Sequence, residues 1–153
     1  MNLKILEFPN RNLCLYENEL KLFYSKCTFK WGNRKTTEIF DNENRKIFEV
    51  NYNGYFYDKF QIIYQSSYLN GKLKSVDNSK IITEDGVIIN RKRIGLNITN
   101  SNFHYYLGAE KIATSKVLKW VNGKVFEMEI STNEKELQYL LIIKFLIYES
   151  GKE

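Results

Sequence analysis

The segment LQYLLIIKFLIY, residues 137–148, decides the fold of this chain. Ten of its twelve residues are apolar or aromatic, and only Gln138 and Lys144 are polar. A helix of this composition is hydrophobic on every side rather than along one stripe, so other parts of the protein must enclose it. Burying ten such side chains contributes roughly 15–30 kcal/mol before entropy is subtracted, at about 1.5–3 kcal/mol each.

The residues before this segment predict where the helix begins. The sequence STNEKE at 131–136 offers Asn133 as an N-cap and Glu136 as the returning acid of a capping box. We therefore expect a helix over about residues 134–149. The twelve residues 137–148 rise about 18 Å, well short of the roughly 30 Å hydrocarbon core of a bilayer, so no transmembrane segment is expected.

The preceding part of the chain predicts strands. Residues 2–131 carry runs of β-branched and aromatic residues, interrupted about every 8–12 residues by Asn, Asp or Gly, which is typical of antiparallel strands. The pairs that supply the positive φ of tight hairpins are Asn53-Gly54, Asn70-Gly71, Asp85-Gly86 and Asn122-Gly123. The expected strands are 2–8, 12–16, 20–31, 36–41, 46–52, 55–68, 73–76, 80–83, 87–93, 96–99, 103–107, 111–120 and 124–130.

An apolar terminal helix after so many strands has two solutions. The strands can wrap around the helix as a barrel, or the helix can be buried between this chain and a partner. The first solution is simpler. We expect a mainly β fold, a single antiparallel β-barrel of about 12 strands that encloses the hydrophobic C-terminal α-helix, with residues 1–153 as one domain. The sequence leaves the oligomeric state open.

Two stretches carry a resemblance to a known family. The sequence IFDNEN at 39–44 looks like an aspartate-containing turn before a strand, and FEMEI at 126–130 runs into the apolar helix. In the order of its expected elements and in its residue pattern, the chain resembles the tubby-like superfamily, which includes tubby C-terminal domains, phospholipid scramblases and LURP-one-related proteins. The resemblance implies a barrel of roughly twelve strands around a C-terminal helix. The chain shows no cysteine-rich palmitoylation stretch, no EF-hand-like acidic loop and no recognisable headgroup-binding signature.

Composition and charge narrow the class of protein. One Pro, eight Gly and two Cys exclude collagen-like, Pro-rich and disulfide-scaffold proteins. The net charge is +5, and residues 127–153 carry six acids against three bases, so residues 1–126 carry +8. A net positive charge of this kind favours the binding of anionic partners. The start MNLKILEFPNRN lacks the pattern of a secretory signal, so we expect a cytoplasmic protein, or one peripheral to a membrane.

The densest basic cluster predicts a candidate anion site. On a strand, Arg91 and Arg93 share one face and lie about 7 Å apart, the scale of adjacent phosphates or a lipid headgroup. Lys72, Lys74 and Lys80 lie nearby in the sequence and could extend the patch. The alternative is that these charges protect an exposed edge strand against aggregation.

The sequence offers little for catalysis. His104 is the only histidine, and neither a phosphate-binding glycine loop nor a Gly-x-Ser-x-Gly elbow occurs. We therefore expect no enzyme activity, no cofactor and no metal site. The aromatic belt of the middle region is expected to be mostly core, with base stacking as an alternative role; it comprises Tyr52, Tyr55, Phe56, Tyr57, Phe60, Tyr64 and Tyr68. Trp31 and Trp120 are expected in the core or at the barrel rim.

Together these features predict a non-catalytic binding module for an anionic ligand or a phospholipid membrane surface, acting through the basic patch. The first alternative is a protein–protein interaction module of the inhibitor or immunity type, favoured by the small size and abundant Tyr. The second alternative is binding of single-stranded nucleic acid, which is the partner expected least.

Overall fold

The computed structural model describes residues 1–67, 72–95, 102–120 and 123–152. Within these residues there are twelve strands, one short 3-10 helix and one α-helix. The strands are β1 (Asn2–Phe8), β2 (Asn12–Glu17), β3 (Leu20–Lys30), β4 (Arg34–Asp41), β5 (Lys46–Asn53), β6 (Lys59–Gln65), β7 (Leu73–Val76), β8 (Lys80–Thr83), β9 (Ile88–Arg93), β10 (Phe103–Leu107), β11 (Glu110–Lys119) and β12 (Val125–Ile130). The helices are η1 (Pro9–Arg11) and α1 (Lys135–Glu149).

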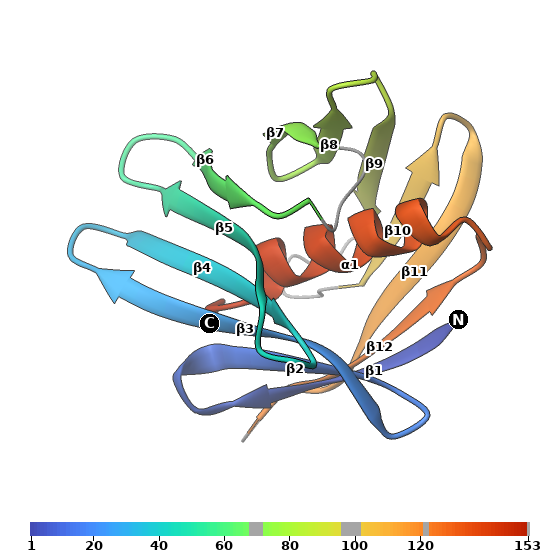
Figure 1. The fold of residues 1–153 in the computed structure, drawn as a ribbon, viewed down its shortest axis with the longest axis horizontal. Coiled ribbons are helices and arrows are strands. Elements are labelled where there is room, and N and C mark those ends of the chain that lie inside the picture. Colours follow the sequence, from blue (N-terminus) through green and yellow to red (C-terminus); the bar gives the residue numbers. More distant parts are fainter. Residues whose placement is uncertain (68–71, 96–101, 121–122, 153) are drawn as a thin grey trace.

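The strands form one antiparallel sheet in the order β6-β5-β4-β3-β2-β1-β12-β11-β10-β9-β8-β7. The pairing of β1 with β12 joins all the strands into one continuous sheet, which curls into a nearly closed barrel (Figure 1). The edge strands β6 and β7 are bridged by a side chain: Gln65 donates from Nε2 to the Leu73 carbonyl at 2.8 Å and accepts from the Leu73 N–H at 2.7 Å. The predicted antiparallel barrel of about 12 strands is confirmed.

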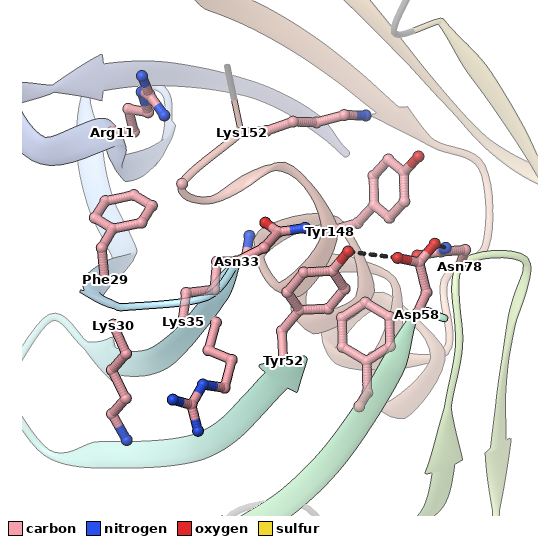
Figure 2. Close-up of a pocket in the computed structure, with 13 residues that line it drawn as sticks. Arg11, Phe29, Lys30, Asn33, Lys35, Tyr52, Asp58, Asn78, Tyr148 and Lys152 are labelled. Carbon is pink, nitrogen blue, oxygen red and sulfur yellow. Dashed lines mark hydrogen bonds between the residues drawn. The ribbon is translucent and has the colours of Figure 1, made fainter. Parts of the chain in front are cut away.

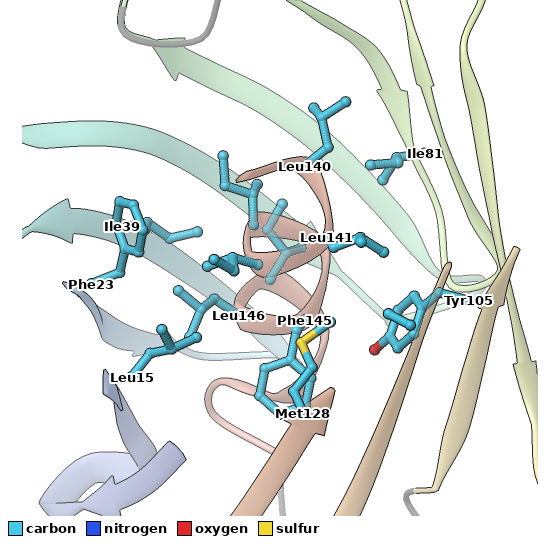
Figure 3. Close-up of a cluster of buried hydrophobic side chains, with 14 of the residues drawn as sticks. Leu15, Phe23, Ile39, Ile81, Tyr105, Met128, Leu140, Leu141, Phe145 and Leu146 are labelled. Atoms are coloured by element: carbon cyan, nitrogen blue, oxygen red, sulfur yellow. The ribbon is translucent and has the colours of Figure 1, made fainter. Parts of the chain in front are cut away.

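Helix α1 lies inside this barrel (Figure 1). Inward-facing side chains of the surrounding strands point at it, as Figure 3 shows for Leu15, Ile39 and Tyr105. Phe145 is fully buried and meets the Phe126 ring edge-on, with 5.3 Å between ring centroids. The all-round apolar segment is therefore enclosed by its own sheet, as its composition predicted.

The alternating strands divide the connections between two ends of the barrel. The β1–β2, β3–β4, β5–β6, β7–β8, β9–β10 and β11–β12 connections share one end, because each strand is antiparallel to the next. Helix α1 ends there, since the Gly151 N–H donates to the Arg11 carbonyl at 3.0 Å and the Lys124 ammonium to the Lys152 carbonyl at 2.7 Å. We call this the helix-exit end and the other the helix-entry end.

The start of α1 differs from the prediction. Glu134, not Asn133, is the N-cap residue, and no side chain caps the first turn. Instead the Thr132 hydroxyl accepts the Glu134 N–H at 3.2 Å, and the Gln138 amide donates to the Thr132 carbonyl at 2.8 Å. The predicted capping box is wrong because the chain turns one residue later than the Asn–Glu spacing requires.

The strand predictions fail in one described place. Residues 55–58 are not part of a strand, and β6 begins only at Lys59. Gly54 does not have a positive φ; a Cβ added there would lie 2.7 Å from the Asn33 amide nitrogen, so that side chain would have to shift. The positive φ expected at Gly86 and Gly123 is confirmed, at 91° and 88°. The predicted strand 96–99 and the Asn70-Gly71 turn lie outside the described residues.

The aspartate turn at 41–44 is stabilised by a buried carboxylate. Asp41 ends β4 and is 2% exposed. It accepts the N–H groups of Glu43 and Arg45 at 2.9 Å and the Arg45 Nε at 2.7 Å. These bonds keep the pKa of Asp41 below its usual value although burial opposes the shift. The Asp41 carboxylate therefore stabilises the turn itself.

Candidate functional site

The candidate site is a pocket of about 420 Å³ at the helix-exit end, which we call the exit pocket (Figure 2). The turns of the barrel and the residues around the end of α1 converge on it. Its lining comprises Arg11, Phe29, Lys30, Asn33, Arg34, Lys35, Tyr52, Asp58, Phe60, Asn78, Tyr148, Gly151 and Lys152. A cavity of this size is in the range of small-molecule sites.

The charge of the exit pocket is strongly positive. In the described part of the chain, its cationic residues are Arg11, Lys30, Arg34, Lys35 and Lys152, and its one carboxylate is that of Asp58. That carboxylate already accepts hydrogen bonds from the Tyr52 hydroxyl and the Asn78 amide, a row visible in Figure 2. Burial and the neighbouring Asp58 raise the pKa of Tyr52 to about 12, so it remains a donor at neutral pH. The positive charge of these cationic residues is therefore only partly neutralised. A concave surface with such an excess of positive charge concentrates anions.

Some of these cations also stabilise the end of α1. The Lys35 ammonium donates to the Ser150 carbonyl, and burial lowers its pKa. A cation at a helix C-terminus offsets the partial negative charge of its last carbonyls. Lys30 and Arg34 have no such role: neither forms an ion pair with a residue that the structure describes, and the Arg34 Nε donates to the Trp31 carbonyl at 3.0 Å. These two residues are the pocket cations most open to a ligand.

A buried charged cluster lies behind the pocket, around Tyr148. The Arg91 guanidinium stacks 3.0 Å from the Tyr148 ring centroid, and its Nη1 lies 4.0 Å from the Glu149 carboxylate. Lys152 lies 3.7 Å from the same carboxylate. Burial alone would raise the pKa of Tyr148, but the charges of Arg91 and Lys152 outweigh it and lower that pKa. Burial raises the pKa of Glu149.

The structure brings together only part of the predicted basic patch. Arg91 and Arg93 do share one face, and their guanidinium carbons lie 4.1 and 5.7 Å from the Phe103 ring centroid. That face is the inner one: Arg91 is 8% exposed, whereas Arg93, at the end of the strand, is exposed, and anion binding by this pair stays a prediction. Strand β9 lies between β8 and β10, but the β8 register ends at Asn90, so the alternative of a protected edge at residues 91–93 also stays a prediction.

The three lysines of the predicted patch lie elsewhere. Lys72 and Lys74 are exposed and Lys80 is half-buried. Leu73 and Ile81 point inward beside them, so Lys74 and Lys80 point outward from the sheet. None of the three lines the exit pocket. Lys72, Lys74 and Lys80 therefore do not extend the Arg91–Arg93 pair into one concave surface.

Sequence reasoning missed the β3–β4 turn and the exposure of the aromatic loop. The stretch KWGNRK at 30–35 places three cations around Gly32 and Asn33, whose φ values of 79° and 53° form the turn. A Gly-Asn pair between two basic strand ends was the available signal. Tyr55, Phe56 and Tyr57, expected mostly in the core, are 62%, 87% and 72% exposed.

Comparison with protein-family models, with curated proteins and with solved structures finds no match for this chain. The resemblance to the tubby-like superfamily therefore stays a prediction. No helix in the described ranges is long and apolar enough to span a bilayer. Among the same residues, no group of three or more His, Cys, Asp or Glu side chains is placed to hold a metal ion.

Proposed function

We propose that the protein is a non-catalytic module that binds a phosphate-bearing anion in the exit pocket. One observation carries the proposal: among the residues that the structure describes, five cations line a single cavity against one carboxylate, which is already hydrogen-bonded. Guanidinium forks such as those of Arg11 and Arg34 match the geometry of phosphate oxygens. A soluble phosphate and the headgroup of an anionic phospholipid present the same chemistry to these groups.

The shape of the pocket supports a group larger than a single ion. Phe29, Tyr52, Phe60 and Tyr148 supply ring surface between the cations. Ligand sites commonly combine such apolar walls with a few charged groups that fix orientation. The pocket therefore suits a phosphate attached to an organic group.

Charge reversal at the pocket tests the proposal. The double variant Lys30→Glu/Arg34→Glu is expected to bind pyrophosphate at least about tenfold more weakly than wild type, because opposed charges replace two pocket cations. Isothermal titration calorimetry at low and raised salt measures this, and wild-type binding should weaken as salt rises.

The matched control is Lys72→Glu/Lys74→Glu, which changes the net charge equally at exposed residues outside the pocket. It is expected to bind pyrophosphate within about twofold of wild type, since screening weakens distant charges. Equal losses in both double variants would show that only the overall field attracts the anion, and the proposed site would be abandoned.

A second candidate function, protein–protein interaction, is favoured by the edge of β6. Among the strands that the structure describes, β6 pairs with β5 alone, and residues 60–65 (FQIIYQ) carry no charge. Ile63 and Tyr64 are 46% and 43% exposed. Edge strands are normally protected by charges or Pro, so an uncharged one is suited to adding a partner's strand.

The variant Ile63→Lys places a charge on this edge and is expected to release a strand-adding partner. Affinity capture from native lysate, with quantification of each stoichiometric partner, measures the loss. Ile88→Lys, at a similarly exposed position of β9, is the control. A partner that both variants retain equally does not bind the β6 edge.

A further inference from the structure

Exposed aromatic side chains gather at one end of the barrel. Eight aromatic side chains of the described residues are exposed, and all except Tyr64 lie at the helix-exit end. Four of them project from two turns: Trp31 from β3–β4, 85% exposed, and Tyr55, Phe56 and Tyr57 from β5–β6. We call these four residues the aromatic rim.

The two turns of the rim lie side by side. The Gly54 N–H donates to the Asn33 carbonyl at 3.1 Å, and the Asn33 amide donates to the Gly54 carbonyl at 3.2 Å. The Tyr55 and Phe56 rings meet edge-on, with 4.6 Å between centroids. The rim is thus one joined surface rather than separate mobile tips, and contiguous exposed apolar surface of this kind marks an interaction site.

The charged residues are also divided unequally between the two ends of the barrel, with an excess of bases at the end that carries the exposed aromatic residues. The connections of the helix-exit end carry Arg11, Lys30, Arg34, Lys59, Lys80 and Arg93. Asp58 and Asp77 lie there as well, and both accept hydrogen bonds from neighbouring residues. At the helix-entry end, the described connections and the residues that flank them carry the acids Glu17, Glu19, Asp41, Glu43, Glu84, Asp85, Glu110 and Glu134, against the bases Arg45, Lys46, Lys72 and Lys135. One end of the barrel is therefore basic and aromatic, and the other carries an excess of acids.

We propose that the aromatic rim docks the protein onto an anionic phospholipid bilayer, with the exit pocket over the headgroup phosphates and α1 directed along the membrane normal. Trp and Tyr rings are suited to the headgroup level, because one part of each ring system is apolar and another is polar. Lys30 and Arg34 flank Trp31 in the sequence and face the same layer of negative charge. The acidic helix-entry end faces away, where like charge repels the membrane least. This inference rests on the proposed anion site and names the bilayer as its source of phosphate.

The test compares binding to vesicles with binding to a soluble anion. Wild type is expected to cosediment with vesicles of phosphatidylcholine and phosphatidylserine, and far less with phosphatidylcholine alone. The rim variant Trp31→Ala/Phe56→Ala is expected to bind the anionic vesicles at least about tenfold more weakly, yet to bind pyrophosphate as wild type does, because neither residue lines the pocket. Leu20→Ala removes a side chain that is 70% exposed at the opposite end, and should bind vesicles normally.

The outcomes separate the two proposals. If wild type binds pyrophosphate but not anionic vesicles, or if the rim variant binds the vesicles as tightly as wild type does, the docking inference is overturned and the anion site stands. If wild type binds neither probe, both proposals fall. Salt-sensitive binding of single-stranded oligonucleotides that is lost in the rim variant, without vesicle binding, would assign the rim to nucleic acid and overturn membrane docking. Because both rim residues are exposed, thermal unfolding of the variant should match wild type.

Discussion

Replacing Phe145 by Ala is expected to lower the free energy of unfolding by about 3–5 kcal/mol. Phe145 is fully buried in the C-terminal half of the enclosed helix, and its ring packs against Phe126 of β12. Truncation leaves a cavity behind. The surrounding sheet cannot collapse to fill this cavity, because β12 is held on both sides by its pairing with β1 and β11. Urea unfolding followed by fluorescence measures the change.

The control is Lys135→Ala in the first turn of the same helix, where the side chain is exposed. It should change the free energy of unfolding by no more than about 0.5 kcal/mol. A Phe145→Ala variant that unfolds like this control would mean that α1 is not the centre of the core. Midpoints that rise with protein concentration would instead support the alternative of a helix buried between subunits.

The enclosed helix could be predicted because its evidence is local. A helix formed by residues 137–148 is apolar on every side, so the prediction does not depend on choosing which face is buried. Such a helix must be enclosed by other parts of the protein. The turns at Gly86 and Gly123 were predictable for the same reason, since a positive φ is a property of two adjacent residues. The loop 54–58 was not, because its aromatic residues have the same composition as a buried strand and only their exposure distinguishes them.

The site could be predicted only in part because it is assembled from distant segments. Alternation placed Arg91 and Arg93 on one face correctly, but nothing in the local sequence says whether that face is inside or outside. Arg11, Arg34 and Lys152 are far apart in the chain and meet only because β1 to β4 and the end of α1 reach the same end of the barrel. Which connections share an end of the barrel depends on how many strands precede them in the chain. One misplaced strand therefore assigns the later connections to the wrong end, and the residues of the pocket no longer come together.

Lys144 carries the second large expected effect, because it is a cation inside the hydrophobic core. It is 1% exposed, and its ammonium donates to the Asp77 carbonyl. Burial, and then the charge of Arg91, lower its pKa to about 7, although Asp77 opposes the shift. In the unfolded chain the pKa returns to its ordinary value of 10.5. Between these two values the unfolded chain holds a proton that the folded protein has released.

The free energy of unfolding should therefore rise with pH through this window, by on the order of 5 kcal/mol in total for this group. Lys144→Met removes the group, so this variant is expected to be more stable than wild type near about pH 7, with the difference shrinking toward about pH 10 as the folded and unfolded lysines become alike. Urea unfolding of both proteins at several pH values measures the difference, and Lys135→Met makes the same substitution at an exposed position of α1. A difference that is constant across the pH range would show that Lys144 keeps its ordinary pKa in the folded protein. In that case water, or a rearrangement around Asp77, would have to solvate its charge inside the barrel.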